Sequence, residues 1–519
     1  MGWLVCFSYL CGCPFIVEGR DKQDLFKIVD GTYLYPLALM ITFTIALLTL
    51  ILGYVVYGKF VNRIFGPDER ATPAVAQADG IDYIVLPPWK LFMIQFLNIA
   101  GLGPIFGAIM GAQFGTGSYL WIVFGTIFGG AVHDFFVGTI SLRNGGESLP
   151  QIVGRYLGHR VKTLMCLFTI ALLVLVAAVW VAGPAEILGR MTEGYVSVMA
   201  WIVIIFLYYV LATMLPIDKI IGKVYPVFAF ILLFMAVGIT VVLYVRCPAL
   251  PEMWTGFGTK YDEAPIFPML FISIACGAIS GFHATQSPLM ARCVGHERQC
   301  RPVFYGAMVT EGIVALIWAA AATVFYHENG VVDPATGKVF TAAAVASGLS
   351  KEWLGAIGGS IAILGIVVAS ISSGDTALRS ARLIVADFFH LGQQQVWRRL
   401  LVSLPIFLIT AGVLVYSLSD AAGFKIIWRY FAWCNQTLAV FALWAITVYL
   451  SQMGKPYWVS LFPALFMTAV CSTYIVMAPE GFGLSAAVGY PVGACAVLLA
   501  VGLFFRWRAA FEKTQRLGR

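Results

Sequence analysis

Residues 91–112 read LFMIQFLNIAGLGPIFGAIMGA, and this stretch decides the fold. It carries no charged residue and is long enough to span a bilayer as a helix. Its middle contains four helix breakers, Gly101, Gly103, Pro104 and Gly107. Glycine costs about 1 kcal/mol and proline about 3 kcal/mol in a helix interior, and unwound backbone in lipid lacks hydrogen-bond partners. We therefore predict a discontinuous helix that lines a binding site near the middle of the membrane.

The composition identifies a membrane protein. Of the 519 residues, 60% are hydrophobic and 11% are charged, and the mean hydropathy is +0.87, whereas soluble proteins have about 25% charged residues. The net charge of +7 therefore concerns the side of the membrane that the loops face, rather than a nucleic-acid partner. The 11 cysteines are scattered, which indicates core packing and not a disulfide framework. Because no phosphate-binding loop, nucleophile–base signature or zinc-protease motif is present, we predict no enzyme and no cofactor. Cys293, His296 and Cys300 are spaced like metal ligands but lack a fourth ligand nearby, so we predict no metal site.

Hydrophobic spans with short polar connections follow one another along the chain, which predicts a single polytopic all-α domain. We predict thirteen spans, at 34–57, 91–112, 119–142, 163–183, 196–215, 225–245, 266–287, 303–326, 354–373, 399–418, 428–450, 457–477 and 484–505. Residues 1–33 form an N-terminal extension that we leave unassigned, and residues 506–519 form a basic tail. Alternate connections carry most of the 33 Lys and Arg residues, which places the N-terminus outside and the C-terminus in the cytoplasm.

A second interrupted span lies five spans after the first. Residues 266–287, IFPMLFISIACGAISGFHATQS, carry Gly277 and Gly281 at their centre. Because five is odd, this span starts at the opposite face of the membrane, which is the pattern of an inverted-repeat transporter. We predict a leucine-transporter-like arrangement of two five-helix repeats, at residues 91–245 and 266–450. One additional helix, at 34–57, precedes the repeats, and two more, within 457–505, follow them.

The glycines at the two breaks allow two interpretations. They either let backbone approach a substrate or let neighbouring helices pack closely. Under the first interpretation, the variants Gly103→Leu and Gly281→Leu fill only a cavity, so we expect them to fold but not to transport.

Few ionisable residues lie inside the predicted spans, and such residues are usually functional. They are His133, Asp134 and Glu311, with Asp375 just beyond the end of a span. Each is a candidate for ion or proton coupling. The alternative is a structural role, which for Asp375 would be an ion pair with Arg379 one helical turn away.

Neutral polar residues flank both breaks. Asn98 precedes the first break, and Ser280 and His283 lie at the second, so all three join the break glycines and Pro104 in the predicted substrate site. Half-helix N-termini there would favour a substrate carboxylate. Ser372 and Ser373 offer hydroxyl oxygens to a coupling Na⁺, or else bond back to carbonyls of their own helix.

Several motifs, in the same order over most of residues 50–450, resemble the carbon starvation protein A family. They are ATPAVAQADGIDY (71–83), IAGLGPIFGAIMGAQFG (99–115), GGAVHDF (129–135), LRNGGESLPQI (142–152), CGAISGFHATQS (276–287), DTALRSAR (375–382) and Asn435-Gln436. The resemblance implies a bacterial or archaeal inner-membrane transporter implicated in pyruvate and peptide uptake, with the five-plus-five inverted repeat. Many relatives carry a His-His pair before the first break, where this chain has Ile94 and Gln95.

Together these features predict a symporter that imports a small carboxylate such as pyruvate, coupled to H⁺ or Na⁺. Peptide or amino acid uptake is the alternative substrate class, and a channel or a nutrient sensor is the alternative type of protein. We expect a small-molecule substrate and membrane lipid as partners, and no nucleic acid. The sequence leaves the oligomeric state open.

Overall fold

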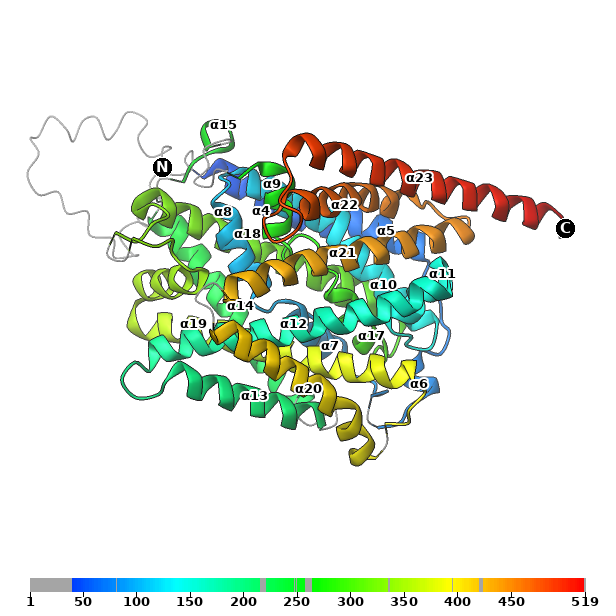
Figure 1. Cartoon of the computed structure of the whole chain (residues 1–519), viewed down its shortest axis with the longest axis horizontal. Helices are drawn as coiled ribbons and strands as arrows, with labels where there is room; N and C mark the ends of the chain where they lie inside the picture. The colour runs from blue at the N-terminus through cyan, green and yellow to red at the C-terminus, as the bar shows by residue number, and fades with distance from the viewer. Residues whose placement is uncertain are drawn as a thin grey trace, which may run out of the picture.

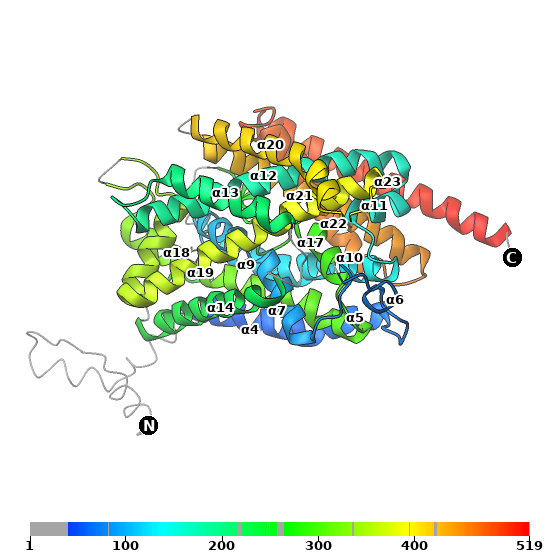
Figure 2. The same cartoon turned by 90° about the horizontal axis from the view of Figure 1, so that it is seen from below.

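The computed structural model describes residues 40–80, 82–214, 221–246, 248, 250–256, 264–334, 337–393, 395–419 and 423–517. Within these residues the regular structure is helical, apart from one isolated bridge between Val332 and Val339. Figures 1 and 2 show the helices running mostly along the long axis of one bundle. The predicted extension 1–33, and the start of the first predicted span, lie outside the described residues.

The first half of the described chain forms long helices because their apolar runs satisfy the backbone internally. The bounds of these elements are α4 (Ile41–Leu52), η2 (Gly53–Tyr57), α5 (Gly58–Phe65), α6 (Pro73–Ala76), α7 (Pro88–Ile99), η3 (Gly103–Gly107), α8 (Ala108–Ala112), α9 (Gly117–Phe124), η4 (Gly125–Gly130), α10 (Ala131–Arg143), α11 (Leu149–Leu157), α12 (His159–Met191), α13 (Val198–Met214) and α14 (Ile221–Arg246). Gly66, with φ +66°, ends α5 in the left-handed conformation that glycine adopts without strain.

The second half continues with the other interrupted helix. Its elements are α15 (Met253–Gly256), α16 (Ile266–Ser273), α17 (His283–Ala291), η5 (Glu297–Gln299), η6 (Arg301–Gly306), α18 (Ala307–Asn329), α19 (Ala342–Phe388), α20 (Val396–Ser419), α21 (Gly423–Gln452), α22 (Trp458–Met477) and α23 (Ala486–Leu517). The long helices α12 and α19 pack along each other in the interior. Helix α23 projects beyond the bundle in both views.

Each predicted span coincides with helical segments, but the number of membrane crossings stays a prediction. Among the described residues, ten helices are long and apolar enough to cross a membrane, and the bent pair Pro88–Ile99 and Gly103–Ala112 makes up to eleven. Val198–Met214 is a shorter apolar helix. The stretch from Ile266 to Ala291 is divided into α16 and α17.

Helices continue past the ends of three predicted spans because an apolar run underestimates helix length. The first helix continues to Phe65 through the π-helical turn η2, and α19 continues to Phe388. Asp375 therefore lies inside a helix rather than beyond it. The basic tail after residue 505 is helical as far as Leu517. In α19 the polar stretch remains helical because its side chains are buried among other helices rather than exposed to lipid.

Both predicted helix breaks are present. The axes of α7 and of the η3–α8 segment differ by 53°. The second break is longer, because the backbone leaves helical geometry at Ile274 and α17 begins only at His283. Gly277 has φ +89°, a conformation that favours glycine, within this unwound segment.

The two breaks pack directly against each other. A Cβ atom on Gly103 would lie 2.2 Å from Cβ of Cys276, and one on Gly277 would lie 3.4 Å from Cα of Pro104. A Cβ atom on Gly281 would lie 2.2 Å from the backbone oxygen of Asn435. The expectation that leucine at Gly103 or Gly281 would fill only a cavity is therefore wrong. These glycines allow close approach of backbone and side chains.

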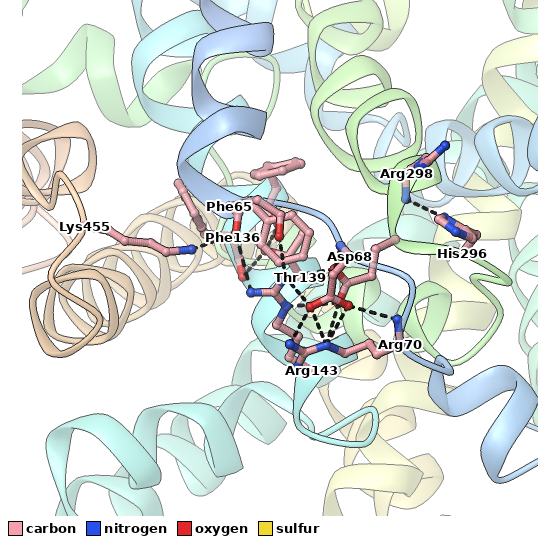
Figure 3. Close-up of polar contacts among 12 residues, drawn as sticks. Phe65, Asp68, Arg70, Phe136, Thr139, Arg143, His296, Arg298 and Lys455 are labelled. Atoms are coloured by element: carbon pink, nitrogen blue, oxygen red, sulfur yellow. Dashed lines mark hydrogen bonds and ion pairs between the residues drawn. The ribbon is translucent and has the colours of Figure 1, made fainter.

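At one end of the bundle, polar contacts join several loops. We call this end, where Arg143 and Lys455 lie, the basic face. Arg143 at the end of α10 makes two hydrogen bonds to Glu297, at 3.0 Å (Nε–Oε1) and 2.8 Å (Nη2–Oε2), and Glu297 also accepts from the backbone N–H of Asp68 at 2.8 Å. Lys455 donates to the Phe65 carbonyl at 2.7 Å. Figure 3 shows Arg143 at the centre of these contacts. The loop after α5 is thereby fixed to α10, to the loop before η6 and to the loop after α21.

The exposed part of this network contains an ion pair between Arg70 and Asp68. Arg70 donates to both carboxylate oxygens of Asp68 at 2.6–2.9 Å. This side-chain hydrogen bonding from Arg70 lowers the pKa of Asp68 to about 2. The carboxylate therefore stays ionised through the neutral pH range, and its contribution is lost only as the pH falls towards that value.

Candidate functional site

A chain of four ionisable side chains crosses the interior beside the breaks. Nδ1 of His133 lies 2.8 Å from Oδ1 of Asp134, and Nδ1 of His283 lies 2.9 Å from Oδ2 of the same carboxylate. On its other side, Nε2 of His283 lies 3.3 Å from Oε2 of Glu311. All four side chains have zero exposure. The structure thus brings together three of the predicted elements, α10, α17 and α18.

The charges of these four buried side chains must be balanced. Two ionised carboxylates beside two neutral imidazoles would place two negative charges in the interior. Burying such charges without positive partners costs a large amount of free energy. Within the described chain, the ion pairs of Asp134 and Glu311 involve only His133 and His283. The two imidazoles are therefore the groups that can balance these two carboxylates.

The backbone at the second break is satisfied by side chains of α21. Asn435 accepts from the Phe282 N–H at 2.6 Å through its side chain and from the Gly281 N–H at 3.1 Å through its backbone oxygen. Gln436 donates to the carbonyls of Phe271 and Ala275, both at 3.2 Å. The two half-helices are thus capped from one neighbouring helix.

This capping overturns one part of the predicted substrate site. The backbone N–H groups from Gly281 to Thr285 all have acceptors, so the N-terminus of α17 has no free donor for a substrate carboxylate. The hydroxyl of Ser280 also has partners, because it donates to Asn435 Oδ1 at 3.2 Å and lies 3.3 Å from Sγ of Cys276. In this conformation Gly277, Ser280 and Gly281 hold the break together, while His283 belongs to the ionisable chain.

Buried polar atoms without a hydrogen-bond partner are present at the first break. Asn98 is fully buried, and neither its Oδ1 nor its Nδ2 has a hydrogen-bond partner. Oε1 of Gln95 and Nε1 of Trp180 are buried and unpaired as well. A Cβ atom on Gly101 would lie 3.1 Å from the Trp180 ring, so Trp180 packs against the backbone of the first break. Buried polar groups in native proteins are nearly always paired, so Asn98 stays a candidate for the predicted substrate site.

Trp180 was missed by the sequence analysis. It lies in the middle of α12, in an uninterrupted apolar span, and only its position next to a broken helix distinguishes it from core tryptophans. Its ring lies 4.7 Å from Phe282 and 6.0 Å from Phe431, centroid to centroid. Together these three aromatic rings form an apolar cluster that contains residues of α12 and α21 and Phe282 of the second break.

The hydroxyls of Ser372 and Ser373 on α19 make different contacts, although the sequence suggested the same two interpretations for both, a Na⁺ ligand or a bond within the helix. Ser373 donates to the carbonyls of Leu97 and Asn98 at 3.1 and 3.0 Å, at the end of α7. Ser372 instead bonds back to Ala369 within its own helix at 2.8 Å. Only the first of these two hydroxyls meets carbonyl oxygens of a broken helix.

Asp375 lies two residues beyond Ser373 on α19, and the ion pair with Arg379 that was the alternative role is absent from the described contacts. Its Oδ2 accepts from the Tyr225 hydroxyl at 2.7 Å, whereas Arg379 donates to the Ala212 carbonyl at 2.8 Å. Oδ1 of Asp375 is buried and unpaired. The carboxylate therefore joins α19 to α14 and is separate from the chain through His283.

The fold, with two broken helices crossing at its centre, is that of secondary transporters with the leucine-transporter-like architecture. A manganese transporter from Eremococcus coleocola superposes with a TM-score of 0.54 over 83% of this chain and 98% of that one, at 13% identity. A Na⁺-coupled sialic acid symporter does so with a TM-score of 0.51 over 88% and 96%, at 14% identity. The chain belongs to the family described as Carbon starvation protein CstA, whose model matches residues 38–200, 192–351 and 326–474.

Relatives of the same family carry transporter names. The chain is 27% identical to a peptide transporter CstA of Campylobacter jejuni, over 89% of this chain and 81% of that protein. It is 28% identical to the pyruvate/proton symporter BtsT of Escherichia coli, over 49% of this chain and 44% of that protein. An uncharacterised membrane protein of Haemophilus influenzae is 41% identical over 57% of this chain and 94% of its own length.

Proposed function

We propose that the protein is a symporter of the cell (inner) membrane that imports a small carboxylate, with pyruvate as the leading candidate, together with protons. The observation that carries the proposal is the buried contact of His283 with both Asp134 and Glu311. The name of the pyruvate/proton relative supports the substrate and the ion. The multi-pass helical fold supports the membrane location.

The proposed coupling follows from the donor count of an imidazole. A protonated imidazole donates from both nitrogens, so His283 would hold Asp134 and Glu311 at once. A neutral imidazole has one donor and one lone pair, and that lone pair would face a carboxylate oxygen at about the same distance. Loss of the proton would therefore repel one of the two helices that contact α17, unless the facing carboxyl binds a proton. The position of α17 would then depend on the proton content of the cluster.

The proposed substrate position is the group of unpaired atoms at the first break. Nδ2 of Asn98 and Nε1 of Trp180 are donors without acceptors, and a substrate carboxylate would accept from both. The rings of Trp180 and Phe282 would face its apolar part. The glycines of the first break keep this region narrow, which favours a small molecule over a long one.

Two alternatives have support of their own. A peptide or amino acid is the second candidate substrate, because relatives named peptide transporters match over most of the chain. Na⁺ is the second candidate ion, because Ser373 and the carbonyls of Leu97 and Asn98 place three oxygens together. Carboxyl, hydroxyl and carbonyl oxygens suit hard cations. In this proposal the basic face is cytoplasmic, with the N-terminus outside and the C-terminus inside.

The test is uptake by the purified protein in proteoliposomes. Labelled pyruvate and a labelled dipeptide are supplied separately, each with an inward proton gradient, an inward Na⁺ gradient or none. The proposal predicts that pyruvate accumulates above its external concentration only with the proton gradient. Accumulation of the dipeptide alone would contradict the substrate, and accumulation with Na⁺ alone would contradict the ion. Equilibration without accumulation under every gradient would favour a channel and contradict the symporter.

A further inference from the structure

One face of α19 carries polar residues that lead from the first break to the basic face. Ser373, Ser380 and Asp387 are spaced by seven residues, so they lie on the same side of the helix. Ser373 contacts the end of α7, as described above. Ser380 contacts α17, because its hydroxyl lies 3.3 Å from Nε2 of Gln286. Asp387 faces Arg292, directly after the end of α17, at 3.7 Å.

This polar seam between α19 and the two broken helices is buried at Ser373 and Ser380, whereas the Asp387 side chain is 30% exposed. Hydrogen bonding beside the buried part is incomplete. Gln95 on α7 reaches the hydroxyl of Ser287 on α17 at 3.4 Å, while its own Oε1 has no partner. Oε1 of Gln286 is also buried and unpaired. Unsatisfied groups of this kind are costly in a closed interior, so they indicate partners that are present in another state. The seam thus has the polar lining of a path that is closed in this conformation.

A small cavity lies where the seam approaches the basic face. It is lined by Ser148, Leu149, Thr285, Pro288, Leu289, Arg292, Ser380, Leu383 and Ile384. Residues of α17 and α19 form two of its walls, and the start of α11 forms another. The cavity therefore continues the line of Ser373 and Ser380 towards the ion pair.

Arg292 lies at the end of this row of residues, between the cavity and Asp387. Its side chain is 8% exposed, its Nε donates to the Gly146 carbonyl at 3.0 Å, and its guanidinium lies 5.3 Å from the centre of the Tyr83 ring. The contact with Asp387 at 3.7 Å is longer than a charge-assisted hydrogen bond. A guanidinium binds a free carboxylate with two parallel hydrogen bonds. A substrate carboxylate would therefore compete well with Asp387.

We propose that the seam between α17 and α19 is the exit path of the substrate to the basic face, and that Arg292 is its anion-recognition residue. Asp387 holds Arg292 in place until the carboxylate of a small monocarboxylate replaces it. This inference rests on the proposed function in one respect, which is that the substrate carries a carboxylate.

The first experiment measures pyruvate exchange from each face separately in proteoliposomes. Trypsin cleavage of the helical tail, residues 506–517, reports which vesicles expose the basic face. The inference predicts that Arg292→Gln raises the half-saturating pyruvate concentration about tenfold at the basic face and leaves the opposite face unchanged. Arg292→Lys keeps the charge and should show a smaller effect. Asp387→Asn removes the competing carboxylate and should lower the half-saturating concentration at the basic face.

The matched control is Arg155→Gln, because Arg155 is a half-exposed arginine at the same face that pairs with Glu147. This variant should leave both half-saturating concentrations unchanged. Equal shifts at the two faces for Arg292→Gln, or no shift at either face, would overturn the exit-path assignment.

A second readout does not depend on the substrate. Hydrogen–deuterium exchange of the α17 backbone should be faster in Asp387→Asn than in the unmodified protein, because the end of the helix is released from α19. Identical exchange in the two proteins would overturn the holding role of Asp387. If the unmodified protein accumulates no carboxylate, the proposed function fails, while this comparison still decides whether the ion pair closes the seam.

Discussion

Nδ1 of His283 lies 2.9 Å from Oδ2 of Asp134, with both side chains fully buried. This contact joins α17, the second half of a broken helix, to α10, the helix that follows the other break. It therefore links the two predicted repeats at their centre. Because Glu311 approaches the same imidazole from α18, the His283 ring lies between carboxylates of two other helices.

The contact between Gly103 and Cys276 predicts a rescue by a second substitution. In Gly103→Ala the new Cβ would meet Cβ of Cys276 at 2.2 Å, so we expect a low yield of folded protein. Removing the opposing side chain in Gly103→Ala/Cys276→Gly relieves the clash, since the next atom lies 3.6 Å away. The yield of monodisperse protein after detergent extraction measures both. A double variant as poor as the single one would show that the clash is not the cause.

The capping by Asn435 predicts a loss of stability. In Asn435→Ala the buried N–H of Phe282 loses its acceptor at 2.6 Å, which should cost about 1–3 kcal/mol. Thermal unfolding of the purified protein should shift to lower temperature. Asn329→Ala is the control, because Asn329 is exposed and bonds only within its own helix, to the Phe325 carbonyl. Equal shifts in the two variants would contradict the capping role.

The contacts of Ser373 allow an experiment that distinguishes protons from Na⁺ as the coupling ion. If protons drive transport, uptake should be the same when Na⁺ is replaced by choline, in the unmodified protein and in Ser373→Ala. If uptake instead requires Na⁺, Ser373→Ala should raise the half-maximal Na⁺ concentration, while Ser372→Ala should not, because Ser372 bonds within its own helix. The Na⁺ dependence of initial uptake rates is the measurement, and a requirement for Na⁺ would contradict proton coupling.

The network at the basic face predicts a structural effect of Glu297. This fully buried carboxylate pairs with Arg143 and with the backbone of Asp68. Glu297→Gln should lower the free energy of unfolding by about 1–3 kcal/mol, because the side chain that meets Arg143 loses its charge and one of its two acceptor oxygens. Glu147→Gln, at a partly exposed pair, should cost less than about 1 kcal/mol. Thermal unfolding compares them, and a larger effect of Glu147→Gln would contradict the assigned contacts.

The overall fold was predictable because lipid imposes strong rules on apolar sequence. The helix breaks at Gly103 and Gly277 could be located because glycine and proline interrupt spans that otherwise have no reason to break. The ionisable candidates Asp134 and Glu311 could be selected because charges inside spans are rare. That both contact His283 depends on how α10, α17 and α18 pack, which spacing within single helices does not determine.

Other features could not be predicted for similar reasons. Nothing local distinguishes Ser373, which crosses to α7, from Ser372, which bonds within its helix, because one step along a helix rotates a side chain by about 100°. The N-terminus of α17 looked free in sequence because its acceptor, Asn435, comes from a helix more than a hundred residues later. The role of Trp180 depends on its neighbours in space, since its own span is uniformly apolar.

The most direct test of the central claim compares two activities of Glu311→Gln, which keeps the shape of the side chain but cannot ionise. Reconstituted protein is assayed for pyruvate accumulation driven by a proton gradient and for pyruvate exchange at equal pH, which needs no net proton movement. Proton coupling through the cluster predicts that accumulation is abolished while exchange persists at close to the unmodified rate. Equal loss of both activities would show that Glu311 supports only the structure, and undiminished accumulation would show that protons move elsewhere.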